Sequence, residues 1–145
     1  MYKIREARLG DFAELAKLND TCENIHLAAE PGKLVKGFFV DCLKQCNVRL
    51  LVVEKSGVIV AFILFRMDQT AGEFHIDKLS IKSGYAGKGL DEHLYQKLER
   101  LAVKKDAVQI TATISTTNLA VHDFFKRNDW KQKNQVYIKY LEGEN

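Results

Sequence analysis

The chain has 145 residues, with 22 Lys and Arg against 19 Asp and Glu and a formal charge of +3. Its charges of both signs are interspersed, so the composition gives no clear nucleic-acid footprint, and only the pI of about 8.7 favours a nucleic-acid-associated domain. The longest apolar run, Val58 to Phe65, is too short to span a bilayer, and the charged N-terminus is unlike a signal peptide. We expect one cytoplasmic domain over residues 1–145, without nucleic-acid or membrane partners.

The N-terminal part reads as a strand followed by two helices. Tyr2 to Ala7 alternates as a first strand, and Asp11 can N-cap a helix in which Phe12, Leu15 and Leu18 share one face. Pro31 suits the first turn of a second helix. Its apolar side is formed by Leu34, Val35, Phe38, Phe39, Cys42, Leu43 and Cys46.

The three cysteines follow no metal-ligand spacing. Cys22, Cys42 and Cys46 are an odd number, and the last two are four residues apart on the second expected helix. We expect buried, reduced thiols and no metal site.

A hairpin and a central strand come next. Arg49 to Glu54 and Val58 to Arg66 are rich in β-formers and are joined by a short turn that contains Gly57. Phe74 to Ile81 has the spacing of a mostly buried strand. Ala107 to Ile114 alternates in the same way after an intervening helix, which predicts a parallel pair.

Three glycines, Gly84, Gly87 and Gly89, connect the central strand to that helix, which shows one apolar face. The face is formed by Leu90, Leu94, Leu98 and Leu101. A strand, a glycine-rich turn and a helix N-terminus together favour anion binding, because the first helical amides have no internal partner and glycine permits close approach.

The C-terminal part contains a further helix and strand. Thr116, Thr117 and Asn118 are N-cap residues for a helix that extends through Phe124, Phe125 and Lys126. Trp130 to Leu141 then reads as one strand or two.

The glycine turn fits neither the dinucleotide pattern, because Glu92 replaces the third glycine, nor the P-loop. It resembles the acyl-CoA loop of the GNAT superfamily of N-acetyltransferases, Q/R-x-x-G-x-G/A after a strand of the form L-x-V. The corresponding residues are Leu79, Ser80 and Ile81 in the strand and Ala86, Gly87, Lys88, Gly89, Leu90 and Asp91 in the loop.

Three other segments are similar to the same superfamily. Asn118, Val121, Phe124, Phe125, Asp129 and Trp130 keep the spacing of its N-x-x-A-x-x-[apolar]-Y-x-x-x-G-F motif. The N-terminal segment and the hairpin also match. The resemblance implies an α/β (α+β) fold: a mixed sheet of six to seven strands, about four helices and the order β-α-α-β-β-β-α-β-α-β(-β).

The resemblance also implies an enzyme that transfers an acetyl group from acetyl-CoA to a primary amine by direct attack in a ternary complex. The acceptor is a small molecule or a peptide, and a homodimer is compatible with the expected edge strands. The residues implied in binding acetyl-CoA are Leu79, Ser80, Ile81, Ala86, Gly87, Lys88, Gly89, Leu90, Asp91, Asn118 and Phe125.

Two residues of the central strand are candidate general bases. His75 and Asp77 share parity with Leu79 and Ile81, so we expect all four side chains on one face. An imidazole with a reference pKa of about 6.5 suits proton uptake near neutrality, whereas Asp77 needs a raised pKa or a relaying water. The alternative is that both are only cross-strand polar residues at a solvent-facing edge.

Departures from the motif support a second hypothesis. Ala86 and Asp91 replace the first and last residues of the loop pattern, and Phe125 replaces a tyrosine that often protonates the CoA thiolate. A GNAT-fold CoA-binding or regulatory module with weak or no transferase activity is therefore the alternative function.

Overall fold

The computed structural model describes residues 1–21, 26–28, 35–85, 87–113, 125–128, 130–133 and 136–141. The N-terminal elements are β1 (Tyr2–Glu6), a 3₁₀ turn η1 (Leu9–Asp11), α1 (Phe12–Thr21), β2 (His26–Ala28) and α2 (Lys36–Lys44). Pro31 lies outside the described residues, and α2 begins five positions after it.

Asp11 stabilises the start of α1 differently from the expected N-cap. It is the last residue of η1, and its carboxylate accepts a hydrogen bond from the Arg8 amide at 2.7 Å. The same carboxylate pairs with the Arg5 guanidinium at 2.8 Å, which lowers the pKa of Asp11. The acidic residue therefore ties β1 to the turn before α1.

The expected hairpin and central unit are confirmed. β3 (Val48–Lys55) and β4 (Val58–Asp68) are joined through Ser56 and Gly57, both at positive φ (52° and 81°), as a two-residue hairpin turn requires. The remaining elements are β5 (Glu73–Ile81), α3 (Leu90–Lys104), β6 (Gln109–Thr113), β7 (Lys131–Lys133) and β8 (Val136–Tyr140).

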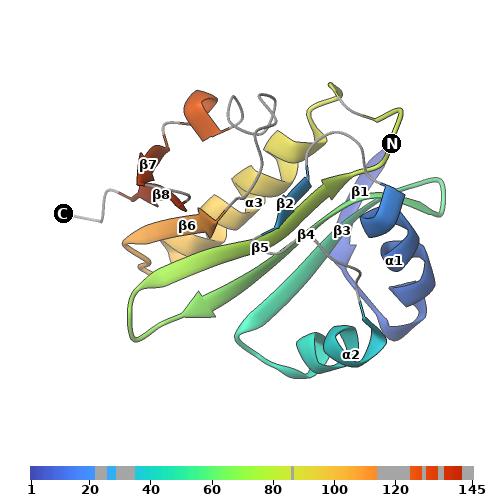
Figure 1. Cartoon of the computed structure of the whole chain (residues 1–145), viewed down its shortest axis with the longest axis horizontal. Coiled ribbons are helices and arrows are strands. Elements are labelled where there is room, and N and C mark those ends of the chain that lie inside the picture. The colour runs from blue at the N-terminus through green and yellow to red at the C-terminus, as the bar shows by residue number, and fades with distance from the viewer. Residues whose placement is uncertain are drawn as a thin grey trace.

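The strands form one mixed sheet in the order β1-β3-β4-β5-β6-β8-β7 (Figure 1). β5 and β6 pair in parallel across α3, as expected, and the other pairs are antiparallel. β2 pairs with β5 outside this order, which brings the sheet to eight strands. No pattern in the sequence indicates β2, which has only three residues. The α+β class with a mixed sheet is confirmed.

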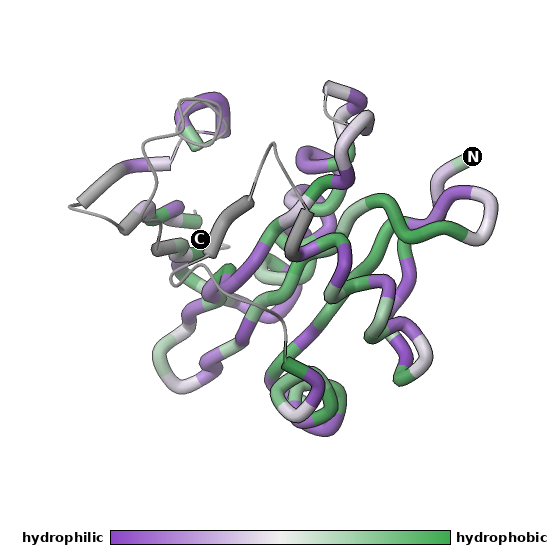
Figure 2. The backbone as a smooth tube through the Cα atoms, turned by 45° about the vertical axis from the view of Figure 1, so that its right-hand side comes forward, coloured by the Kyte–Doolittle hydropathy of each residue, from purple (hydrophilic) through white to green (hydrophobic). Residues whose placement is uncertain are grey.

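Helices cover both faces of the sheet and define two hydrophobic clusters. The α3 face includes Phe65, Phe74, Ile76, Leu94 and Leu98, all buried. The opposite face holds Leu15, Leu18 and Phe39 of α1 and α2 against buried apolar residues of β3 and β4. Figure 2 shows long hydrophobic stretches along the central strands, consistent with burial on both faces.

A β-bulge in β5 corrects the expectation that His75, Asp77, Leu79 and Ile81 share a face. The register against β4 shifts between Leu64 and Phe65, so that β5 has one extra residue at Asp77. Leu79 and Ile81 consequently join the α3 cluster, to which Phe74 and Ile76 belong before the bulge. His75 alternates with those two residues and therefore faces the other side of the sheet.

Two further observations concern the cysteines and the helices. Cys42 is buried as expected, whereas Cys46 is exposed, because α2 ends at Lys44 before the helical spacing reaches it. No helix in the described ranges has the length and apolar character needed to cross a membrane.

Candidate active site

The glycine-rich turn presents the N-terminus of α3 with little side-chain cover. Gly87 and Gly89 have φ values of 77° and 79°, a left-handed conformation that disfavours other residues. Gly89 is the N-cap and provides no side-chain cap, so the first amides of α3 depend on other partners. A Cβ at either glycine would have no atom within 4 Å, so the space beside both is open. The turn therefore suits an anionic group.

Asp91 is turned toward α3 itself. Its Oδ1 accepts the Glu92 amide at 2.9 Å, and only 13% of its side chain is exposed. The Arg127 guanidinium lies 3.8 Å from Asp91 and 3.5 Å from Glu92. Arg127 therefore offsets the negative charge that these two carboxylates bring to the first turn, and Asp91 occupies one amide of the helix N-terminus. Lys82 and Lys88 are exposed beside the same turn.

The backbone N–H groups of β5 just before this turn point in directions that can be assigned from one hydrogen bond. The Lys82 amide donates to the Val60 carbonyl of β4 at 2.8 Å. Because N–H groups alternate along a strand, those of Leu79 and Ile81 face away from β4. β6 pairs with β5 only from Glu73 to Ile76, and beyond that point this edge is paired with β2.

Polar side chains gather at the opposite end of β5 because of strand register. His75 lies opposite Thr111 of β6, and Glu73 lies opposite Gln109. The His75 Nδ1 and Thr111 Oγ1 are 2.6 Å apart. Thr111 Oγ1 donates to Glu73 at 3.2 Å, and Gln109 Nε2 donates to the other oxygen of Glu73 at 2.6 Å. These residues form a continuous hydrogen-bonded chain, here called the β5–β6 chain.

Asp77 is held by Arg66 of β4. The guanidinium donates to both carboxylate oxygens, at 2.7 and 2.9 Å. The His75 Nε2 lies 3.7 Å from Asp77 Oδ1, beyond hydrogen-bond distance. The structure thus brings the two candidate bases together, but the carboxylate is already committed to a bidentate pair.

Burial lowers the pKa of His75 below its ordinary value, while the Asp77 charge opposes that shift and Arg66 reinforces it. The imidazole is accordingly the free base at neutral pH, with 19% of its side chain exposed. A neutral imidazole beside a carboxylate is able to accept a proton and to be stabilised once charged.

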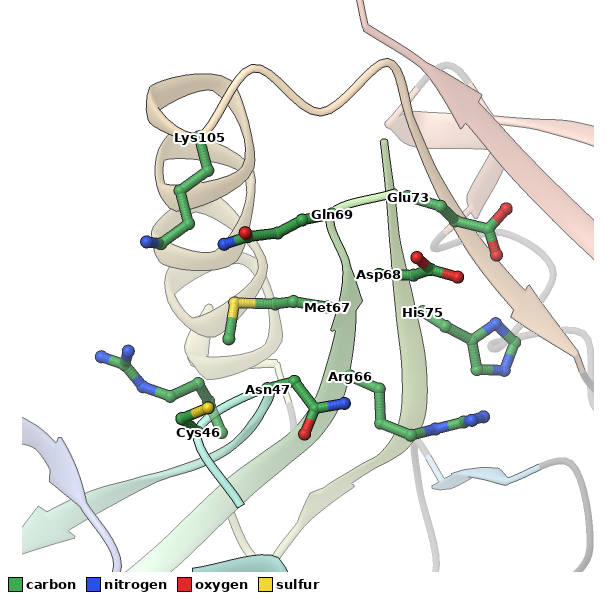
Figure 3. Close-up of a pocket in the computed structure, with 10 residues that line it drawn as sticks. Cys46, Asn47, Arg66, Met67, Asp68, Gln69, Glu73, His75 and Lys105 are labelled. Atoms are coloured by element: carbon green, nitrogen blue, oxygen red, sulfur yellow. The ribbon is translucent and has the colours of Figure 1, made fainter. Parts of the chain in front are cut away.

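A pocket of about 550 Å³ adjoins this end of β5 (Figure 3). Glu73, His75 and Arg66 extend to one side of the strands, and Lys105 and Gln69 lie toward α3. Other residues that line the pocket are Arg49, near the start of β3, and Cys46 and Asn47, which immediately precede this strand. The pocket therefore borders the polar cluster and lies at the far end of β5 from the glycine turn.

Of the other residues expected to bind acetyl-CoA, some are buried and some lie outside the described residues. Ser80 and Leu90 are buried in β5 and at the start of α3. Phe125 is fully buried and stacks on Tyr137, with ring centroids 4.2 Å apart. Ala86 and Asn118 lie outside the described residues. Within the described ranges, no three metal-ligating side chains are grouped.

Sequence reasoning missed four residues of the site: Arg66, Glu73, Thr111 and Arg127. Glu73 is two residues from His75 in β5, and Thr111 is two residues from Gln109 in β6, so the sequence alone places each pair on one face of its strand. Pairing them across strands requires the register, and the contact of Arg127 with Asp91 requires the tertiary fold.

The chain is similar to several known N-acetyltransferases along almost its whole length. An N-alpha-acetyltransferase from Sulfurisphaera tokodaii is 22% identical over 154 residues, covering 99% of this chain and 88% of that protein. The PaiA N-acetyltransferase from Thermoplasma acidophilum, solved with coenzyme A, has a TM-score of 0.77 at 15% identity, with 97% and 99% of the two chains covered. The ribosomal-protein-S18-alanine N-acetyltransferase from Escherichia coli has a TM-score of 0.79 at 12% identity, covering 100% and 98%.

The family comparison covers most of the chain. The acetyltransferase (GNAT) family matches residues 12–130, a range that includes β5, the glycine turn, α3 and β6. The chain therefore belongs to the acetyltransferase (GNAT) family and is an enzyme of the acyltransferase class.

Proposed function

We propose that the protein transfers an acetyl group from acetyl-CoA to a primary amine, by direct attack of the amine in a ternary complex. The observation that carries this proposal is the α3 N-terminus, which follows two left-handed glycines and whose N-cap residue, Gly89, has no side chain to cap it. The Thermoplasma relative was solved with coenzyme A, which supports the same ligand.

The proposed ligand positions follow from the backbone. The amides from Gly87 to Asp91 hold the pyrophosphate, with Ala86 and the exposed Lys88 beside it. The N–H groups of Leu79 and Ile81 face the pantetheine arm and the thioester carbonyl, and Ser80 spaces them along the strand. Asn118 and Phe125 are proposed to border the CoA thiol.

Strand β2 has to leave the edge of β5 for this arrangement to form. Leu27 pairs with Leu79, whose N–H faces β2 by the alternation described above. One edge cannot pair with a strand and with a pantetheine amide at the same time. We propose that acetyl-CoA replaces β2 along Lys78–Ser80, so that displacement of β2 reduces the apparent affinity.

The chemical step needs a proton acceptor for the amine. The amine nitrogen forms a bond to the thioester carbon, the C–S bond breaks, and the amine proton passes to His75 Nε2. His75 and Leu79 are four residues apart, about 13 Å along an extended strand, so the proton passes from the amine to Nε2 along a chain of several water molecules. Asp77 then stabilises the imidazolium, since it lies 3.7 Å from Nε2.

The thiolate leaves without an acid at position 125. A phenylalanine ring has no proton to donate, and Phe125 is buried against Tyr137 and Trp130. The CoA thiol has a pKa near that of cysteine, so its anion is a competent leaving group and is protonated afterwards by water. We expect slow turnover relative to an enzyme with tyrosine at this position.

A thermal-melting series tests the ligand class. Acetyl-CoA and CoA should both raise the melting temperature, because they bind only the native state, whereas ATP should have a smaller effect. No shift with millimolar CoA would contradict the proposal. Thioester consumption measured with a panel of amines then identifies the acceptor, starting with peptide α-amines because two relatives are named for that activity.

A second candidate is a CoA-binding regulatory module without turnover. The pairing of β2 with the β5 edge and the bond from Asp91 to the Glu92 amide favour it. Stabilisation by CoA with no thioester consumption across the amine panel would select this candidate.

A further inference from the structure

We propose that Glu73 and Thr111 are positioning residues that hold His75 in the tautomer needed for proton uptake. This inference rests on the proposed role of His75 as the base. It assigns a purpose to a partly buried polar chain that crosses from β5 to β6 and lies at the far end of β5 from the glycine turn.

The direction of each hydrogen bond in the β5–β6 chain follows from donor chemistry. A carboxylate accepts only, so the Thr111 hydroxyl gives its hydrogen to Glu73 at 3.2 Å. The Thr111 oxygen is then the acceptor for His75, 2.6 Å away, and Nδ1 carries the ring hydrogen. This tautomer leaves a lone pair on Nε2, which is the nitrogen that faces Asp77.

The opposite tautomer is poorly supported by the same geometry. A hydrogen on Nε2 would have its nearest carboxylate oxygen 3.7 Å away, too far for a hydrogen bond. Gln109 donates to the second oxygen of Glu73 at 2.6 Å and fixes that carboxylate in place. Thr111 is 7% exposed, so water does not readily replace its hydroxyl.

The charged groups around His75 come from several elements. Glu73 and Asp77 lie on its own strand and Arg66 on β4, while β6 contributes only the uncharged Thr111 and Gln109. From α2, the Cys42 thiol lies near Asp77, and burial raises the pKa of this thiol. Among the residues that the structure describes, the charges that act on His75 are those of Asp77, Arg66 and Glu73, which lie on β5 and β4.

The test uses the ring nitrogen signals of His75 in long-range ¹H–¹⁵N NMR spectra of the free protein. We expect the wild type to show the Nδ1–H tautomer. Thr111→Val, which keeps the shape and removes the hydroxyl, should produce a mixture of tautomers, and Glu73→Gln should shift the population in the same direction. Asp68→Asn is the matched control, since it removes a nearby exposed charge outside the chain and should leave the tautomer unchanged.

Activity supplies the second measurement. Thr111→Val should lower kcat about tenfold with KM for acetyl-CoA unchanged, as expected for loss of one positioning hydrogen bond. An Nε2–H tautomer in the wild type, or an unchanged tautomer in both variants, would overturn the inference. Because the NMR result does not depend on turnover, a protein with the expected tautomer and no activity would instead contradict the proposed function.

Discussion

The two ends of β5 are built by different means. At the glycine end, the groups offered to a ligand are backbone amides of the strand edge and of the first turn of α3. At the other end, the chemistry resides in side chains from three strands, held by the β5–β6 chain and by the pair between Arg66 and Asp77. The bulge at Asp77 separates the two ends.

This difference leads us to expect that the loop tolerates substitution better than the polar end does. A backbone amide donates whatever side chain its residue carries, and Arg127 offsets the charge of Asp91. We expect less tolerance at the polar end, because each side chain there supplies a donor or acceptor in a partly buried hydrogen-bonded chain. Substitutions should therefore affect turnover at one end and CoA affinity at the other.

The largest expected effect is at the polar end. His75→Ala should lower kcat roughly 100-fold, the usual contribution of a general base, with the Kd of CoA unchanged. Steady-state thioester consumption and calorimetric CoA titration measure the two quantities. His93→Ala, on the exposed face of α3, is the matched control. A parallel loss of CoA affinity in His75→Ala would remove the functional separation of the two ends.

At the glycine end, Gly87→Val should weaken CoA binding by about tenfold or more, since a side chain at φ 77° strains the turn and blocks the open space. Gly57→Val is the control, because Gly57 has a similar φ of 81° in a distant hairpin turn. Both variants should lose stability of about 1–2 kcal/mol, but only Gly87→Val should lose affinity. Equal affinities in calorimetry would show that the turn does not hold CoA.

A substitution in β2, which pairs with the edge of β5 between these two ends, should increase the affinity for CoA. Leu27→Pro removes an N–H that faces β5 and should release β2, so that CoA binds about fivefold more tightly. A substitution that increases affinity is not explained by misfolding. Unchanged or weaker binding would show that β2 does not compete with CoA.

How far the sequence predicts the site depends on the same contrast. The strand, glycines and amphipathic helix from Phe74 to Leu101 are local patterns, and β5 and α3 form as expected. The expectation that His75 and Leu79 share a face was wrong. The bulge between them depends on pairing with β4 and leaves no trace in the alternation of apolar and polar residues. The pairing of β2 with β5 was also missed, because the three residues of β2 are too few to show a period-two alternation.

A smaller effect is expected for Asp91→Asn. Its carboxylate already pairs with the Glu92 amide and lies near Arg127, so removal of the charge should strengthen CoA binding only about twofold. Calorimetry at low and high salt measures this change. A gain of about 100-fold would mean that Asp91 blocks the pyrophosphate position.

The smallest effect concerns stability at acidic pH. Because folding lowers the pKa of His75, the unfolded chain takes up a proton first, at about pH 6.5. The free energy of unfolding should therefore decrease as the pH falls below 6.5 and toward the lower pKa of the folded state. His75→Gln should reduce this decrease in urea melts between pH 8 and 5, and an identical pH profile would contradict the shift.

The central claim is that CoA binds to the backbone of one end of β5 and leaves the side chains of the other end in place. Amide and ring ¹⁵N NMR spectra recorded during a CoA titration test it directly. We expect shifts for the amides of Leu79, Ile81, Gly87 and Gly89, with an unchanged His75 tautomer. Saturable shifts confined to the pocket residues around Arg49 and Lys105, or no shifts at millimolar CoA, would contradict it.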